Sequence, residues 1–363
     1  MIRAIHPRWA LILFLSPALA RADSNQDALQ HYNQGVQALS AGNLDRAIAE
    51  FTETIRINPK DPRPYGNRGY AYLVSHALDS AIADFTAALQ LDPKTPRCYK
   101  LRGDAHLGKG DFDRALVDYE KAMEGGAKDV DFYSNRGLAY MGKKDYERAL
   151  ADYHEAIRLN SNDFTLYVNR ASIYALKKDY ESAIADYNQA LRLAPGNGGV
   201  YFTRGIAYAE QKDYQHALAD FNEAIRLAPQ FAIAYYNRGG VHLEMKDYQS
   251  AVADFQRAIE LAPQHPWSYF SLAHLLSCCP KAELRDGQKA LEYANKGCEL
   301  AQWRNPGGLD ALAAAHAELG DFDKAIHWEG KALESAQDYP VGEQEKMRTR
   351  LQLYKQGKPY RLE

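Results

Sequence analysis

The chain has 363 residues, of which 44 are basic and 47 acidic, and its formal net charge at pH 7 is −3. No long run of one charge sign occurs, so nothing in the composition predicts a nucleic-acid partner. Apolar residues make up 46% of the sequence, which is ordinary for a folded protein.

Residues 1–22 predict a secretory signal peptide. Arg3 and Arg8 give a positive start, an apolar stretch follows at 9–15, and Ala20-Arg21-Ala22 fits the A-x-A cleavage pattern. An uncleaved anchor is the less favoured alternative, because the apolar stretch is well short of the roughly 20 residues that a spanning helix needs. We therefore expect an exported protein, cleaved near Ala22, that is periplasmic or extracellular and has no stable membrane insertion.

A period of 34 residues dominates the rest of the chain. Alanine recurs at 47, 81, 115, 149, 183, 217 and 251, and an aromatic residue at 51, 85, 119, 153, 187, 221 and 255. A period of this length is typical of an array of supersecondary units, none of which buries its apolar face alone. Within 23–265 the register predicts seven regular units, at 28–61, 62–95, 96–129, 130–163, 164–197, 198–231 and 232–265.

Each unit is predicted to be a helix hairpin. In 232–265, apolar residues recur at spacings of three and four, which is the helical period. Lys246-Asp247-Tyr248 interrupts this pattern as a turn, and Pro263 ends the second helix. The predicted fold class is therefore all-α, a solenoid of antiparallel helix hairpins.

The eighth position of each unit is small, and we expect a close helix contact there. Glycine inside a helix costs roughly 1 kcal/mol relative to alanine, so its recurrence implies that the partner helix packs closely against it. The residues at this position are Gly35, Gly69, Gly103, Gly137, Ala171, Gly205 and Gly239.

An arginine at position 7 and an aspartate at position 23 occur together in six units. These positions lie opposite one another in an antiparallel hairpin, so we expect ion pairs that clamp the two helices rather than a binding site. The pairs are Arg68 with Asp84, Arg102 with Asp118, Arg136 with Asp152, Arg170 with Asp186, Arg204 with Asp220, and Arg238 with Asp254.

The pattern resembles the tetratricopeptide repeat (TPR), in a variant whose first helix carries Asn-Arg-Gly, as at 237–239. The resemblance covers residues 28 to about 338 and implies a right-handed superhelix. In that family the first helices line a concave face, which usually binds peptides or proteins. The resemblance thus implies a non-enzymatic scaffold with a protein or peptide partner.

The regular register ends at 265. Residues 266–339 predict two irregular units of the same kind, with five extra residues before Arg285-Asp286-Gly287, and 340–363 predict a capping helix and a tail. The closing segment 357–361 and the 285–287 loop resemble the C-terminal section of bacterial proteins of the same family, which supports a bacterial origin.

No catalytic or metal-binding motif stands out. His274 and Cys278 have metal-ligand spacing, but two ligands do not make a zinc site, and metalloprotease, phosphate-binding and nucleophile-elbow motifs are absent. Cys98, Cys278, Cys279 and Cys298 are predicted to be free thiols, because hairpin geometry separates them beyond disulfide reach. We expect no enzymatic activity, no catalytic residues, no metal and no cofactor.

The candidate peptide-binding residues lie on the face that the resemblance assigns to the groove. Position 6 carries an asparagine ladder, which in some members of the family binds a peptide backbone; the alternative is that these amides bridge adjacent helices. Other groove positions change from basic to apolar along the chain, which suggests an acidic and aromatic ligand or ordinary surface variation. The residues are Asn33, Asn67, Asn135, Asn169 and Asn237, the basic Arg63, Arg97 and Lys100, and the apolar Phe202, Ile206 and Tyr236.

The favoured function is a scaffold that binds an extended peptide or protein segment. Two alternatives stay open. One is a structural or self-associating envelope protein without a specific groove ligand, and the other is an accessory subunit of an enzyme complex.

Overall fold

The computed structural model describes residues 24–362, and the predicted signal peptide lies outside them. The described residues form nineteen α-helices and no strand, which confirms the predicted all-α class. None of these helices combines the length and the apolar content needed to cross a bilayer. The chain divides after Lys178 into two compact units.

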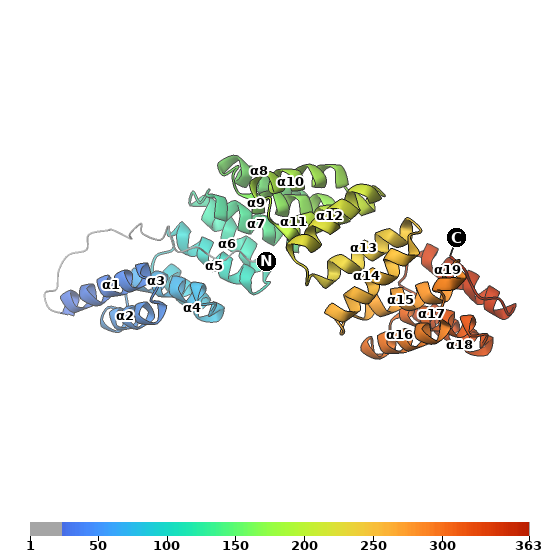
Figure 1. The fold of residues 1–363 in the computed structure, drawn as a ribbon. Helices are drawn as coiled ribbons and strands as arrows, with labels where there is room; N and C mark the ends of the chain where they lie inside the picture. Colours follow the sequence, from blue (N-terminus) through green and yellow to red (C-terminus); the bar gives the residue numbers. More distant parts are fainter. Residues whose placement is uncertain (1–23, 363) are drawn as a thin grey trace. The chain divides into compact units, whose positions relative to one another are not determined.

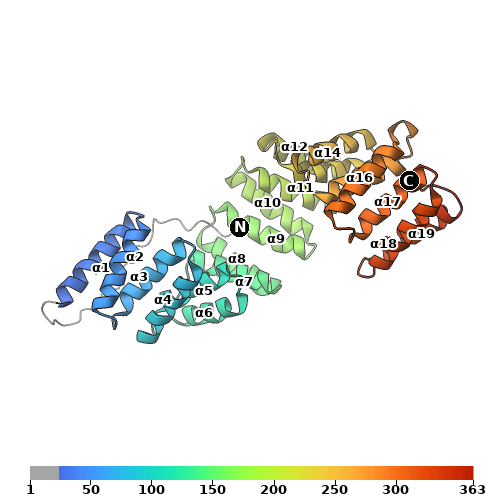
Figure 2. The ribbon, with the colours of Figure 1, turned by 90° about the horizontal axis from the view of Figure 1, so that it is seen from below.

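The first compact unit contains nine helices, of which α1–α8 form four successive hairpins (Figures 1 and 2). The first helices of consecutive hairpins contact one another, and each second helix also contacts the first helix that follows it. The helices are α1 (Ser24–Ser40), α2 (Leu44–Ile57), α3 (Pro62–Val74), α4 (Leu78–Leu91), α5 (Pro96–Gly108), α6 (Phe112–Glu124), α7 (Val130–Gly142), α8 (Tyr146–Leu159) and α9 (Phe164–Leu176).

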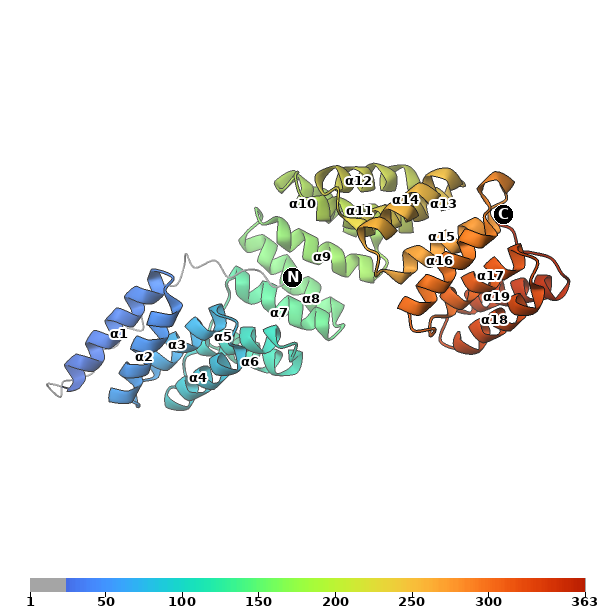
Figure 3. The same cartoon turned by 60° about the horizontal axis from the view of Figure 1, so that its bottom comes forward.

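The second compact unit contains ten helices (Figure 3). A short 3-10 helix at Ala282–Leu284 lies in the longer connection between α15 and α16, and α19 packs against α18. The helices are α10 (Tyr180–Leu193), α11 (Gly198–Glu210), α12 (Tyr214–Leu227), α13 (Ala232–Glu244), α14 (Tyr248–Leu261), α15 (Pro266–Cys278), α16 (Gly287–Leu300), α17 (Pro306–Glu318), α18 (Phe322–Ser335) and α19 (Val341–Lys355).

Local sequence explains how each hairpin turns. In the α13–α14 turn, Lys246 has a φ of +62°, in the left-handed region. Asp247 then caps α14, because its Oδ1 accepts a hydrogen bond from the backbone N–H of Ser250 at 3.3 Å. The predicted turn at 246–248 is confirmed.

The predicted close contact at position 8 is also confirmed. A Cβ atom built on Gly239 would lie 2.9 Å from Cε1 of Phe255, the aromatic residue at position 24 of the same hairpin. A Cβ atom built on Gly69 would lie 3.0 Å from Cε1 of Phe85, and one built on Gly205 would lie 2.9 Å from Cε1 of Phe221. The glycine therefore lets the ring pack flat between the two helices, where a larger side chain would overlap with it.

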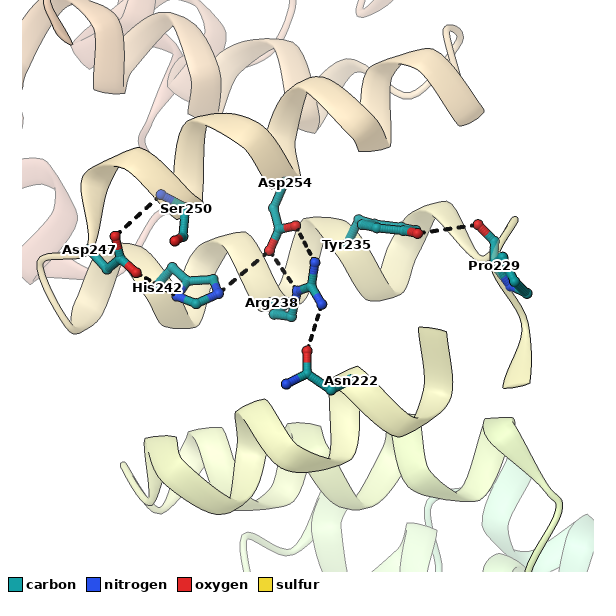
Figure 4. A network of polar contacts seen from close by, with 8 residues as sticks. All are labelled: Asn222, Pro229, Tyr235, Arg238, His242, Asp247, Ser250 and Asp254. Atoms are coloured by element: carbon teal, nitrogen blue, oxygen red, sulfur yellow. Dashed lines mark hydrogen bonds and ion pairs between the residues drawn. The ribbon is translucent and has the colours of Figure 1, made fainter. Parts of the chain in front are cut away.

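The predicted arginine clamp is present and also links neighbouring hairpins. Figure 4 shows Arg238 of α13 donating to both carboxylate oxygens of Asp254 in α14, at 2.8 and 2.6 Å. Its Nη1 donates to Oδ1 of Asn222 in α12, at 2.6 Å. The pairing is confirmed at Arg68, Arg102, Arg136 and Arg204 as well. The pair Arg170–Asp186 stays a prediction.

Candidate functional site

We call the inner face the side of the first helices that carries positions 2, 5, 6, 9, 12 and 13 of each hairpin, which share one side of a helix. All eleven candidate residues belong to it by register. In the first compact unit, two of the candidate asparagines connect neighbouring first helices. Asn67 of α3 donates through Nδ2 to the hydroxyl of Tyr32 in α1 at 3.0 Å, and Asn135 of α7 donates to Asp104 in α5 at 2.9 Å. These contacts match the bridging alternative for the ladder.

The other three asparagines have different surroundings. Asn33 is exposed, and Asn169 is half-buried and lies beside Tyr153. Asn237 donates to the carbonyl of Ile233 within its own helix, at 2.8 Å. The ladder is therefore regular in sequence but not in its hydrogen bonding.

Asp104 is a polar centre of the inner face that sequence reasoning did not assign to the site. Its Oδ1 accepts hydrogen bonds from the Tyr119 hydroxyl at 2.7 Å and from Asn135. Burial raises the pKa of Asp104 to about 6, against the opposing effect of the Lys100 ammonium. A signal existed in the sequence, because Asp104 is the one acidic residue at position 9 of the first helices.

The candidate basic residues are largely balanced by carboxylates. Arg63 forms a two-pronged pair with Asp61, with the shortest contact at 2.6 Å, and stacks over the ring of Tyr32. Lys100 contacts both carboxylate oxygens of Asp129, at 2.7 and 2.9 Å. Arg97 is half-buried on the same face. The charges of Arg63 and Lys100 are therefore locally neutralised by neighbouring carboxylates.

The apolar candidates lie in the second compact unit and pack against two hydrophobic clusters. Phe202 and Ile206 of α11 pack against a buried cluster of α12 and α13 residues, and the ring centroid of Phe202 lies 4.8 Å from that of Phe231. Tyr236 of α13 packs against Phe255 at 5.9 Å between ring centroids. All three candidates are only half-buried, so each presents apolar surface on the inner face while its remaining surface is packed.

The cysteines are free and buried, which confirms the prediction of thiols. Cys278 Sγ lies 3.8 Å from Nε2 of His274. Burial raises the pKa of the Cys278 thiol and lowers that of His274, so both groups are held in their neutral forms. Among residues 24–362, no three metal-ligating side chains converge on one point.

A buried ionic cluster between α17, α18 and α19 was missed by sequence reasoning. Asp310, Glu329 and Arg350 are each almost fully buried, with Arg350 Nε 2.6 Å from Asp310 Oδ1. A signal was available, because Glu329 falls at position 24, where the regular units carry an aromatic residue.

Comparison with known proteins identifies the repeat. The profile of the tetratricopeptide repeat matches residues 32–96, 67–131, 134–198 and 202–266, more than half of the chain. No curated protein matches the sequence.

Two solved structures share the architecture. The C-terminal part of a TPR repeat-containing protein from Cytophaga hutchinsonii superposes with a TM-score of 0.56 at 19% identity, covering 67% of this chain and 98% of the other. A tetratricopeptide repeat protein from Parabacteroides merdae superposes with a TM-score of 0.51 at 19% identity, covering 68% of this chain and 98% of the other. At such identities the likeness concerns the fold alone.

Proposed function

Because this chain belongs to the tetratricopeptide-repeat family, we propose that it is a non-enzymatic scaffold that binds an extended peptide or protein segment along its inner face. The family's fold is typical of protein–protein interaction. Stacked hairpins present the side chains of successive first helices on one continuous surface, which suits an elongated ligand better than a compact one.

The observation that carries the proposal is the half-buried apolar surface of Phe202, Ile206 and Tyr236. Apolar side chains of this kind, fixed by packing on one side and open on the other, are typical anchors in binding surfaces. Phe202 is held against Phe221 and Phe231, and Tyr236 against Phe255 and His265. Their rings are therefore oriented before a ligand arrives, which lowers the entropy cost of binding.

Asn67 and Asn135 supply polar groups on the inner face of the first compact unit. A side-chain amide has two N–H donors and one acceptor oxygen. The hydrogen bonds of Asn67 to Tyr32 and of Asn135 to Asp104 each use one N–H, which leaves capacity for a peptide group. In this proposal the amides both connect adjacent hairpins and bind the ligand backbone.

The experiment begins with a photo-reactive amino acid at position 236, which identifies the partner by cross-linking in its native compartment and mass spectrometry. The affinity of the purified partner segment is then measured. Phe202→Ala with Tyr236→Ala should weaken binding about 30-fold or more. Asn135→Ala with Asn169→Ala should weaken it about 5- to 100-fold.

The matched control is Tyr235→Ala, which truncates the neighbouring tyrosine of α13 at a position off the inner face. Unchanged affinity in both inner-face double variants, with helical content intact, would remove the inner face as the binding surface. If the asparagine double variant alone has a lower free energy of unfolding but an unchanged affinity for the partner, those amides only connect adjacent helices and do not bind the ligand.

We also propose that the protein is exported and that the mature chain begins near Asp23. The support is the positive start, the short apolar stretch and the Ala20-Arg21-Ala22 pattern. N-terminal sequencing of protein recovered outside the cytoplasm should return a start near Asp23, and a start at Met1 would refute the proposal.

A further inference from the structure

The tail that follows α19 turns back onto α15 and α17. Gly357 has a φ of +65°, and its N–H donates to the carbonyl of Tyr354 at 2.9 Å. The N–H of Lys358 donates to Leu353 at 3.0 Å, which completes a glycine-based helix end. This turn sends the last residues away from the axis of α19.

The tail makes main-chain contacts of the kind that a bound peptide makes. The N–H of Leu362 donates to the carbonyl of Cys278 at 2.8 Å, and Nη1 of Arg361 donates to the carbonyl of Ser277 at 3.0 Å. Both carbonyls belong to the last turn of α15, where backbone acceptors have no partner within the helix. The tail thus satisfies acceptors that the end of α15 leaves open.

Three consecutive side chains of the tail each have a distinct site. Tyr360 packs against a cluster that includes Ala313, Ala317 and Tyr354. Leu362 packs against a second cluster, formed around α14, α15 and α16. Between them, Arg361 extends towards α17, so the segment presents an aromatic ring, a cation and an aliphatic side chain in order.

Glu318 is the centre of this arrangement. Its Oε2 lies 2.6 Å from Nη2 of Arg361, and its Oε1 accepts a hydrogen bond from Nε of Arg285 at 2.9 Å. Arg285 also donates to the carbonyl of Cys279 at 3.0 Å. The 285–287 loop and the closing segment, which stand out separately in the sequence, therefore meet on one carboxylate.

The tail lies on the inner face by register. His274, whose ring is 6.4 Å from that of Tyr360, occupies position 9, as Ile206 does in α11. Cys278 and Glu318 occupy position 13 of their hairpins. The tail therefore covers the part of the inner face that belongs to α15 and α17.

We propose that the inner face of α15 and α17 is a peptide site that recognises an extended aromatic–arginine–aliphatic segment, and that Tyr360–Leu362 occupy it as a tethered ligand. This inference deepens the proposed function, because it gives the chemistry of the segment that binds at this end. A partner with the same triplet displaces the tail. The tail competes with an effective concentration on the order of millimolar, as a short linker implies.

The test uses a fluorescent peptide of residues 356–363 and the chain truncated after Lys358. Fluorescence anisotropy should show that the truncated chain binds the peptide about tenfold or more tightly than the intact chain does, because the tethered tail no longer competes. In the peptide, Arg361→Ala should weaken binding about tenfold, the effect of one lost hydrogen-bonded ion pair. Lys358→Ala, at an exposed position, is the matched control and should have no effect.

Three results would overturn the proposal: equal peptide affinity for the intact and truncated chains, no binding to a truncated chain that keeps its helical content, or equal effects of the two peptide substitutions. If truncation unfolds α15–α19, the full-length variant with Arg361→Ser and Leu362→Ser takes its place and must bind the peptide more tightly than the intact chain. If the intact chain is a dimer and Arg361→Ala converts it to a monomer, the tail binds a second copy of the chain. That result also refutes the tethered arrangement. None of these measurements uses the partner, so their failure is distinct from failure of the proposed function.

Discussion

In α18, Glu329 stands where the regular hairpins carry an aromatic ring, and Arg350 of α19 fills the space beside it, with Nε 3.6 Å from Glu329 Oε1. Glu329 is completely buried. Burial raises the pKa of Glu329 well above its usual range, and the neighbouring Asp310 raises it further. The Arg350 guanidinium therefore lies beside two buried carboxyl groups, of which Glu329 favours its protonated form. Helix α19 is thus held by polar as well as by apolar contacts.

Removing the guanidinium should destabilise the second compact unit. Arg350→Met leaves Asp310 buried without its cation, and breaking such a pair costs about 3–5 kcal/mol. The free energy of unfolding in urea measures the loss. Arg348→Met, at an exposed position of the same helix, is the control and should change stability little, so equal losses in the two variants would contradict a docking role for Arg350.

Two adjacent glycines of α13 should respond in opposite directions to the same substitution. A Cβ on Gly239 would lie 2.9 Å from the Phe255 ring, whereas nothing lies within 4 Å of a Cβ on Gly240. Gly239→Ala should cost about 1–3 kcal/mol through overpacking, and Gly240→Ala should stabilise by up to about 1 kcal/mol through helix propensity. Thermal and urea unfolding of the two variants check this, and a shift of the same sign in both would refute the packing argument.

The arginine clamp should matter more than exposed ion pairs. Arg238→Met leaves Asp254, which is 5% exposed, without its partner, and it also breaks the link to Asn222. We expect a loss of about 3 kcal/mol in the free energy of unfolding. The exposed pair of Arg257 with Glu260 provides the control, because Arg257→Met should change the free energy of unfolding little.

Asp104 should make stability depend on pH in a defined direction. Its pKa is raised to about 6 in the folded protein, so the folded state binds the proton more tightly than the unfolded chain does. The stabilisation from protonation is present below the unfolded pKa of about 4 and is lost as the pH rises through 6. Asp104→Asn keeps the shape of the side chain but has no charge to bury. Its free energy of unfolding, relative to that of the original chain, should therefore increase by about 1–3 kcal/mol between pH 4 and pH 7. A pH-independent difference between their urea unfolding curves would contradict this.

The four thiols should be unreactive until the protein unfolds. Burial raises the pKa of Cys98 to about 11 and that of Cys298 to about 12, so almost no thiolate forms near neutral pH. Thiol titration of the unreduced protein should detect almost none in the native state and four per chain in guanidinium. A count of two in the denatured protein would reveal a disulfide.

The sequence by itself determined the repeated part of the molecule. Helix bounds, the glycine–aromatic contact of Gly239 with Phe255 and the pairing of Arg238 with Asp254 all follow from spacing within one 34-residue hairpin. These interactions join residues that the helical period and a short turn bring together, so a register is enough to predict them. The candidate residues of the inner face could be placed on that face for the same reason.

Only the tertiary structure decided what those inner-face residues contact and how the array ends. The bond from Asn135 to Asp104 connects two hairpins. The charges of Arg63 and Lys100 are neutralised by Asp61 and Asp129, which both occupy position 34 of their units. Glu318 meets Arg285 and Arg361 because the inserted loop and the turn at Gly357 redirect the chain. Contacts between hairpins depend on how successive units stack, and the contacts of Glu318 depend on the path of irregular segments. Hydrophobic periodicity within one unit carries no information about either.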